Sequence, residues 1–94
     1  MLADDDNDAP RVWAISRFNL GYEALSSGDY PRAKDEFEAS LNGMAALGHR
    51  DGETRALAAL GSVALHDGRV GDAIAHLRQS LELARTLGDK DDAA

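Results

Sequence analysis

The residues with the greatest chemical potential in this chain are its histidines and one charged run, and neither set matches a known catalytic or metal-binding pattern. His49, His66 and His76 lack the spacing of a metal site such as His-Glu-x-x-His. Acids and bases alternate over residues 32–38, as on a salt-paired, solvent-exposed helix face. The "GRVG" at 68–71 lacks a following Lys-Ser/Thr, so it predicts a turn rather than a phosphate loop. We therefore predict no enzyme activity, no metal and no cofactor.

The net charge of -7 is concentrated at the two ends of the chain. Residues 1–8 carry four aspartates and no base, and residues 89–94 carry three aspartates and one lysine, which leaves ten acids and nine bases between them. Nucleic-acid binding needs clustered Lys and Arg, so we expect no direct nucleic-acid partner. The two charged ends are predicted to be acidic, disordered tails.

The chain contains no cysteine, which excludes a disulfide, a thiolate zinc site and a thiol nucleophile. Its start, "MLADDDNDAP", is acidic where a signal peptide would be basic and then apolar. No apolar run is long enough to cross a bilayer, so no membrane association is expected. These features favour a cytoplasmic protein.

Length and composition predict one small all-α domain. The chain has 94 residues, of which 44% are hydrophobic. Most of these are Ala and Leu rather than β-branched residues, a balance that favours packed helices over sheet. A chain of this size buries a core but has little room for a deep active site.

The same phrase occurs twice, forty residues apart, as "ALSSGDYPRA" at 24–33 and "ALHDGRVGDA" at 64–73. Eleven identities share this register, including Leu-Gly at 20–21 and 60–61 and Ser-Leu at 40–41 and 80–81. Self-similarity at a fixed period of this length is typical of helical repeat proteins.

Each forty-residue unit has the start and stop signals of two helices. Gly28, Gly48, Gly68 and Gly88 are the expected helix ends, and Asp51 is the expected cap of the third helix. Short connections require neighbouring helices to be antiparallel. We predict four helices, over about 10–28, 29–48, 51–68 and 70–88. Together they form one domain at 9–88, with repeat 1 at about 10–48 and repeat 2 at about 50–88.

The two units, "LGYEALSSGDYPRAKDEFEASL" and "LGSVALHDGRVGDAIAHLRQSL", resemble tetratricopeptide repeats. Leu-Gly, a small residue, Gly-Asp-Tyr at the turn, Ala and an aromatic follow the family pattern in the first copy. In the second, Arg69-Val70 replaces Asp-Tyr and Leu77 replaces the aromatic. The period is similar to the long variant found in bacterial regulators and scaffold proteins. The resemblance implies tandem antiparallel hairpins of a right-handed α-solenoid, and a role in binding proteins or peptides.

The first predicted helix has apolar residues on two sides. Ile15, Phe18, Tyr22 and Leu25 fall within an arc of about 80° at helical periodicity. Trp13, Leu20 and Ala24 lie nearly opposite, and one partner helix covers only one side. In the family the first helix of each pair lines a concave groove. The resemblance implies that Arg55, Ala58, Ser62, Leu65 and His66 continue this groove in the second unit.

Two functions fit such a groove. It could bind an amphipathic helix or apolar segment of a partner, because fully burying four such side chains is worth roughly 6 to 10 kcal/mol. Alternatively, a second copy covers the same stripe in a homodimer or larger assembly. Solenoids usually need three or more units, so we expect either a parent repeat protein, such as a larger bacterial regulator, or self-association. The carboxylate clamp of one family subset is missing, because Phe18 and Tyr22 occupy its positions.

Overall fold

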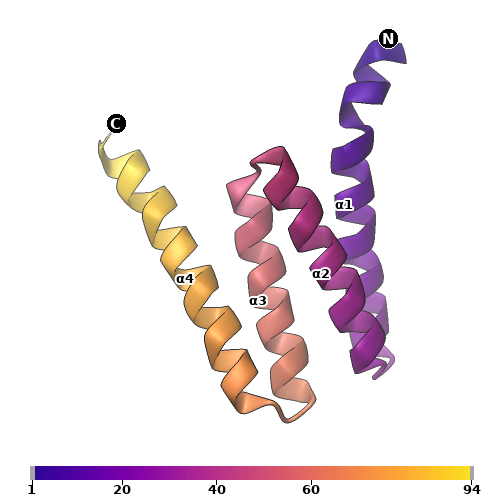
Figure 1. The fold of residues 1–94 in the computed structure, drawn as a ribbon, viewed down its shortest axis with the longest axis vertical. Helices are drawn as coiled ribbons and strands as arrows, with labels where there is room; N and C mark the ends of the chain where they lie inside the picture. Colours follow the sequence, from indigo (N-terminus) through magenta and orange to yellow (C-terminus); the bar gives the residue numbers. More distant parts are fainter. Residues whose placement is uncertain (1, 94) are drawn as a thin grey trace.

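The protein is an antiparallel array of four helices in the order of the chain. The computed structural model describes the backbone of residues 2–93 and the side chains of residues 8–88. The helices are α1 (Leu2–Ser26), α2 (Tyr30–Leu47), α3 (Arg50–His66) and α4 (Val70–Ala93), and no strand occurs among the described residues. Each helix packs against the next one, so α1 and α4 lie at opposite edges (Figure 1). The predicted all-α fold of two tandem hairpins is confirmed.

The turns within the two hairpins are equivalent, as the forty-residue register predicts. Gly28 has a φ of 82° and Gly68 a φ of 81°, values in the left-handed region that favours glycine. After the first turn, Asp29 caps α2, because its Oδ1 accepts a hydrogen bond from the backbone N–H of Arg32 at 3.3 Å. Pro31 then stands in the first turn of α2, where its missing N–H costs nothing.

The core lies where α1, α2 and α3 meet, and Phe37 is its largest side chain. Its ring is fully buried in a cluster whose other buried members are aliphatic: Ala24, Ala33, Ala59, Leu60 and Val63. The ring fits against α1 at Gly21, where an added Cβ would lie 2.6 Å from its Cε1. The equivalent contact in the second hairpin joins Gly61 to Leu77, with 2.7 Å to Leu77 Cγ. The mid-helix glycines therefore allow the close packing of each hairpin.

A buried serine joins the two helices of each hairpin. Ser40 Oγ donates a hydrogen bond to the carbonyl oxygen of Ala14 at 2.9 Å, and Ser80 Oγ donates to that of Thr54 at 2.9 Å. Both hydroxyls are satisfied, so serine stands at these positions without leaving a buried polar atom unpaired. The hydrogen bond to the partner helix thus explains why each hairpin has a buried serine at this position.

The helix ends differ from the predicted boundaries at both tails. α1 begins at Leu2 and α4 continues to Ala93, beyond the helices predicted over about 10–28 and 70–88; Met1 and Ala94 lie outside the described residues. Pro10 is consequently inside α1 rather than at its start. Gly88 does not adopt a positive φ, so it does not end α4.

We expect Gly21→Ala to lower the free energy of unfolding by about 1 to 3 kcal/mol, because the new methyl group meets the fully buried ring of Phe37. Gly61→Ala is expected to cost less, since Leu77 is 44% exposed and can move aside. Urea denaturation measures both changes. Gly71→Ala is the matched control: an added Cβ there meets no atom within 4 Å, so stability stays equal or rises. Equal losses at residues 21 and 71 would contradict the packing described.

Candidate functional site

A groove between α1 and α3 is one of the hollows on the surface of the described residues. It has a volume of about 420 Å³ and lies where the middle of α1 faces the start of α3. Its lining comes from three helices and one joint: Arg11, Ile15, Phe18 and Asn19 of α1, Met44 of α2, His49 of the joint, and Asp51, Gly52 and Arg55 of α3. The groove is therefore formed by the first helices of the two hairpins, with α2 beneath it.

The aromatic side chains along the groove are held by edge-to-face contacts. The ring centroids of Phe18 and Tyr22 are 5.0 Å apart, and each of these rings contacts Phe37, at 5.4 Å and 5.2 Å respectively. Phe37 is fully buried, Phe18 is half-buried and Tyr22 is 47% exposed. The trio thus extends from the core to the surface and fixes the exposed rings in place.

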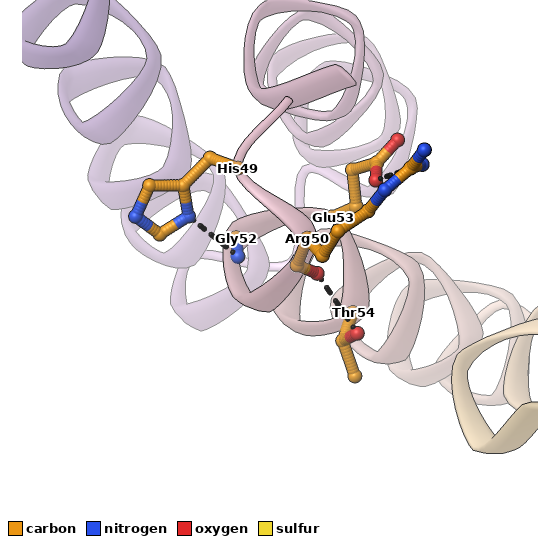
Figure 2. Close-up of polar contacts among 5 residues, drawn as sticks. All are labelled: His49, Arg50, Gly52, Glu53 and Thr54. Atoms are coloured by element: carbon orange, nitrogen blue, oxygen red, sulfur yellow. Dashed lines mark hydrogen bonds and ion pairs between the residues drawn. The ribbon is translucent and has the colours of Figure 1, made fainter. Parts of the chain in front are cut away.

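The far wall of the groove is set by the first turn of α3. The backbone N–H of Gly52 donates a hydrogen bond to His49 Nδ1 at 2.9 Å, so His49 caps this helix (Figure 2). Figure 2 also shows Thr54 Oγ1 donating to the carbonyl of Arg50, and Arg50 paired with the buried carboxylate of Glu53 at 2.9 Å. The prediction that Asp51 caps α3 was wrong. Asp51 lies in the first turn of the helix, where the helix dipole favours a negative charge.

The rim of the groove carries both signs of charge. Arg55 Nη2 lies 3.5 Å from Asp51 Oδ2, and both side chains are largely exposed. Exposed pairs of this kind contribute little to stability and exchange readily with other partners. Arg11 faces them from α1. The rim can therefore contact acidic groups of a bound segment while its floor contacts apolar ones.

The structure brings only part of the predicted set together in this groove. Ile15, Phe18 and Arg55 line it, and Tyr22 lines an adjoining shallow hollow with Asn19 and Ser26. The remaining predicted residues lie further along: Leu25 packs on the core, Ala58 and Ser62 are half-buried, and Leu65 and His66 are exposed at the end of α3. The predicted strip thus lines one hollow at Ile15, Phe18 and Arg55 and a second, shallower hollow at Tyr22.

Six lining residues are not in the predicted set: Arg11, Asn19, Met44, His49, Asp51 and Gly52. Arg11 and Asp51 could have been found from the forty-residue register. They occupy equivalent positions in the two units, one helical turn before the equivalent pair Ile15 and Arg55. Met44 lies on α2, whereas the predicted set comes from α1 and α3. Its sulfur fills the space beside Gly52, which no sequence pattern indicates.

The three histidines have different surroundings. His49 is the N-cap of α3, and His66 Nδ1 lies 2.8 Å from the carbonyl oxygen of Ser62. His76 is half-buried, and its Nδ1 is buried without a hydrogen-bond partner among the described residues. In the same part of the chain, no three His, Asp or Glu side chains are grouped to hold a metal ion.

Two stacked helix hairpins with a groove between their first helices define a helical-repeat protein. Residues 14–86 match the family model described as Tetratricopeptide repeat, which covers most of the chain. The protein therefore belongs to the tetratricopeptide repeat family, whose members mediate protein–protein interactions and are typically not enzymes. No curated protein and no solved structure matched the chain. In the described part, no helix has the length and apolar character needed to span a membrane.

We expect His49→Ala to destabilise the protein by about 1 kcal/mol, because the first turn of α3 loses its cap. His49→Asn is the matched variant, since asparagine restores an acceptor for the Gly52 N–H. Thermal denaturation of the three proteins measures the effect. An asparagine variant as unstable as the alanine one would show that the ring, and not the hydrogen bond, holds this end of the groove.

Proposed function

We propose that the groove between α1 and α3 binds an amphipathic helix or apolar segment of a partner protein, and that the chain acts as a binding module without catalytic activity. The observation that carries this proposal is the exposure of apolar side chains on α1 that are held rigidly from below. Ile15 is 41% exposed and Tyr22 is 47% exposed, while the ring contacts of Phe18 and Phe37 fix Tyr22 in position.

The chemistry of the groove selects the kind of ligand. Ile15 and Phe18 supply an apolar floor, and Arg11, Asp51 and Arg55 supply a charged rim. An amphipathic helix presents apolar residues at i, i+3, i+4 and i+7 with charged residues beside them, which matches a floor and rim of this kind. A ligand that is apolar on all sides would leave the rim unsatisfied.

The expected affinity is modest. Because the groove side chains are about half covered already, covering the rest contributes on the order of 1 kcal/mol for each. Association costs an estimated 4 to 15 kcal/mol, so the apolar surface of the ligand must supply much of the gain. We expect dissociation constants on the order of 10 to 100 µM for a single helix. Such affinity suits a reversible contact.

Two finer hypotheses remain predictions beside this one. Placement within a larger bacterial regulator rests on the resemblance in repeat length, and a cytoplasmic location rests on the lack of cysteine. Self-covering of the groove by a second copy is the alternative to a separate partner. Whether a separate partner or a second copy binds there, the face that carries Ile15 and Tyr22 must be covered when the protein acts.

The groove proposal is tested by selecting binders from a phage-displayed library of amphipathic helical peptides of about 18 residues, or five turns. We expect the selected peptides to share apolar residues at i, i+3 or i+4, and i+7. We further expect Ile15→Asp to weaken their binding at least tenfold, because a charge then faces the apolar side of the ligand.

Ile74→Asp is the matched control, because Ile74 is an isoleucine of similar exposure on α4, away from the groove. Circular dichroism verifies that both variants remain folded. Two results would count against the proposal: selection that yields no helical binders, or binding that weakens equally in the two variants.

A further inference from the structure

A second apolar surface lies on α4 and belongs neither to the groove nor to the core. Four large aliphatic residues, between 44% and 60% exposed, form one row along this helix: Val70, Ile74, Leu77 and Leu81. Their spacing of 4, 3 and 4 places them on a single face. α4 lies at the edge of the array and packs on α3 (Figure 1). We call this row the α4 seam.

The equivalent row on α2 is covered inside the same molecule. The forty-residue register relates the α4 seam to Tyr30, Lys34, Phe37 and Leu41. Tyr30, Phe37 and Leu41 pack in the core cluster with Ala59, Leu60 and Val63 of α3. The α4 seam therefore corresponds to the face of α2 on which α3 packs. It is also more apolar than its covered counterpart, because Ile74 stands in place of Lys34.

The other edge of the array, formed by α1, is polar when α1 is compared with α3 at positions forty residues apart. α3 buries Ala56, Ala59 and Val63 against its neighbours, and the equivalent positions of α1 are Ser16, Asn19 and Glu23, all exposed. Terminal repeats are normally polar on the outside, and α1 follows that rule while α4 does not. Head-to-tail stacking of two copies would bury Asn19 and Glu23 on the α4 seam, at a cost that apolar contacts would have to offset.

We propose that the α4 seam pairs with the α4 seam of a second copy, antiparallel and across a two-fold axis. This continues the α2–α3 packing of one molecule into a contact between two. With Ala84, the seam has the 4-3-4-3 spacing of a helix pair that packs like a coiled coil. Beside it stand Arg78, Glu82 and Arg85, of which Arg78 follows Leu77 at the middle of the seam, so an antiparallel pairing about that point brings the two Arg78 positions near the two-fold axis.

The size of the seam sets the strength of the contact. Four side chains about half exposed correspond to roughly 400 Å² on each copy, which is as large as the largest apolar patch of a typical monomer. Two such patches fall below the roughly 1,200 Å² of a standard interface, so the dimer is weak. We expect a dissociation constant on the order of tens to hundreds of micromolar.

Sedimentation of the full chain from about 10 µM to 1 mM tests this contact. We expect a monomer–dimer equilibrium that Ile74→Lys weakens at least tenfold, since two charges then meet in the seam. The substitution copies the residue that α2 has at the equivalent position, so a helix of this fold accepts it. Ile15→Lys, in the groove, is the control and should leave the equilibrium unchanged. A monomer at every concentration, or dissociation by Ile15→Lys alone, overturns the proposal.

A second measurement identifies the faces in contact, because the natural chain has no cysteine. Arg78→Cys adds a thiol beside the middle of the seam, and Glu23→Cys adds one on the outer face of α1. Under mild oxidation we expect Arg78→Cys alone to form disulfide-linked dimers. Preferential linkage of one variant to the other in a mixture indicates head-to-tail stacking and overturns the two-fold pairing. Because the α4 seam and the groove are separate, failure of this proposal leaves the groove proposal standing, and the reverse also holds.

Discussion

The contact between the Phe37 ring and Gly21 is the interaction on which the rest of the structure depends. The ring occupies the space that a side chain at residue 21 would fill, so α1 and α2 approach closely enough for Phe18 and Tyr22 to contact the same ring. Through Phe37, one face of α1 joins a core that also includes Ala59, Leu60 and Val63 of α3. The interaction thus sets the packing within the first hairpin and the stacking of the second upon it.

The groove follows from this packing rather than from any residue placed for chemistry. One side of α1 is used to bury Ala14, Gly21 and Ala24, and the other side is left with Ile15 and Tyr22 in contact with solvent. The second hairpin repeats the arrangement with a smaller residue at the key position, because Leu77 stands where Phe37 does. Leu77 is part of an exposed row instead of a core because α4 lies at the edge of the described array, whereas α3 covers the equivalent face of α2.

Much of the fold was predictable from the sequence because it depends on local and repeated signals. The forty-residue register, Gly28 and Gly68 at the turns and Asp29 at the start of α2 all lead to the observed hairpins. The bounds of α1 and α4 were predicted less well, because Gly88, an expected helix end, lies inside α4 without a positive φ. In the site, Ile15, Phe18 and Arg55 follow from helical periodicity and the repeat. Met44 and His49 do not, because their positions depend on how the joint between the hairpins folds.

An apolar face of α1 that stays open to water in the isolated chain is the central claim of this account. Nuclear magnetic resonance with a dissolved paramagnetic agent tests it most directly, at a concentration low enough for the chain to be monomeric. We expect strong broadening of the Ile15 methyl and Tyr22 ring signals, while the signals of Ala33 and the Phe37 ring stay sharp. Protection of Ile15 and Tyr22 equal to that of Phe37 would contradict it.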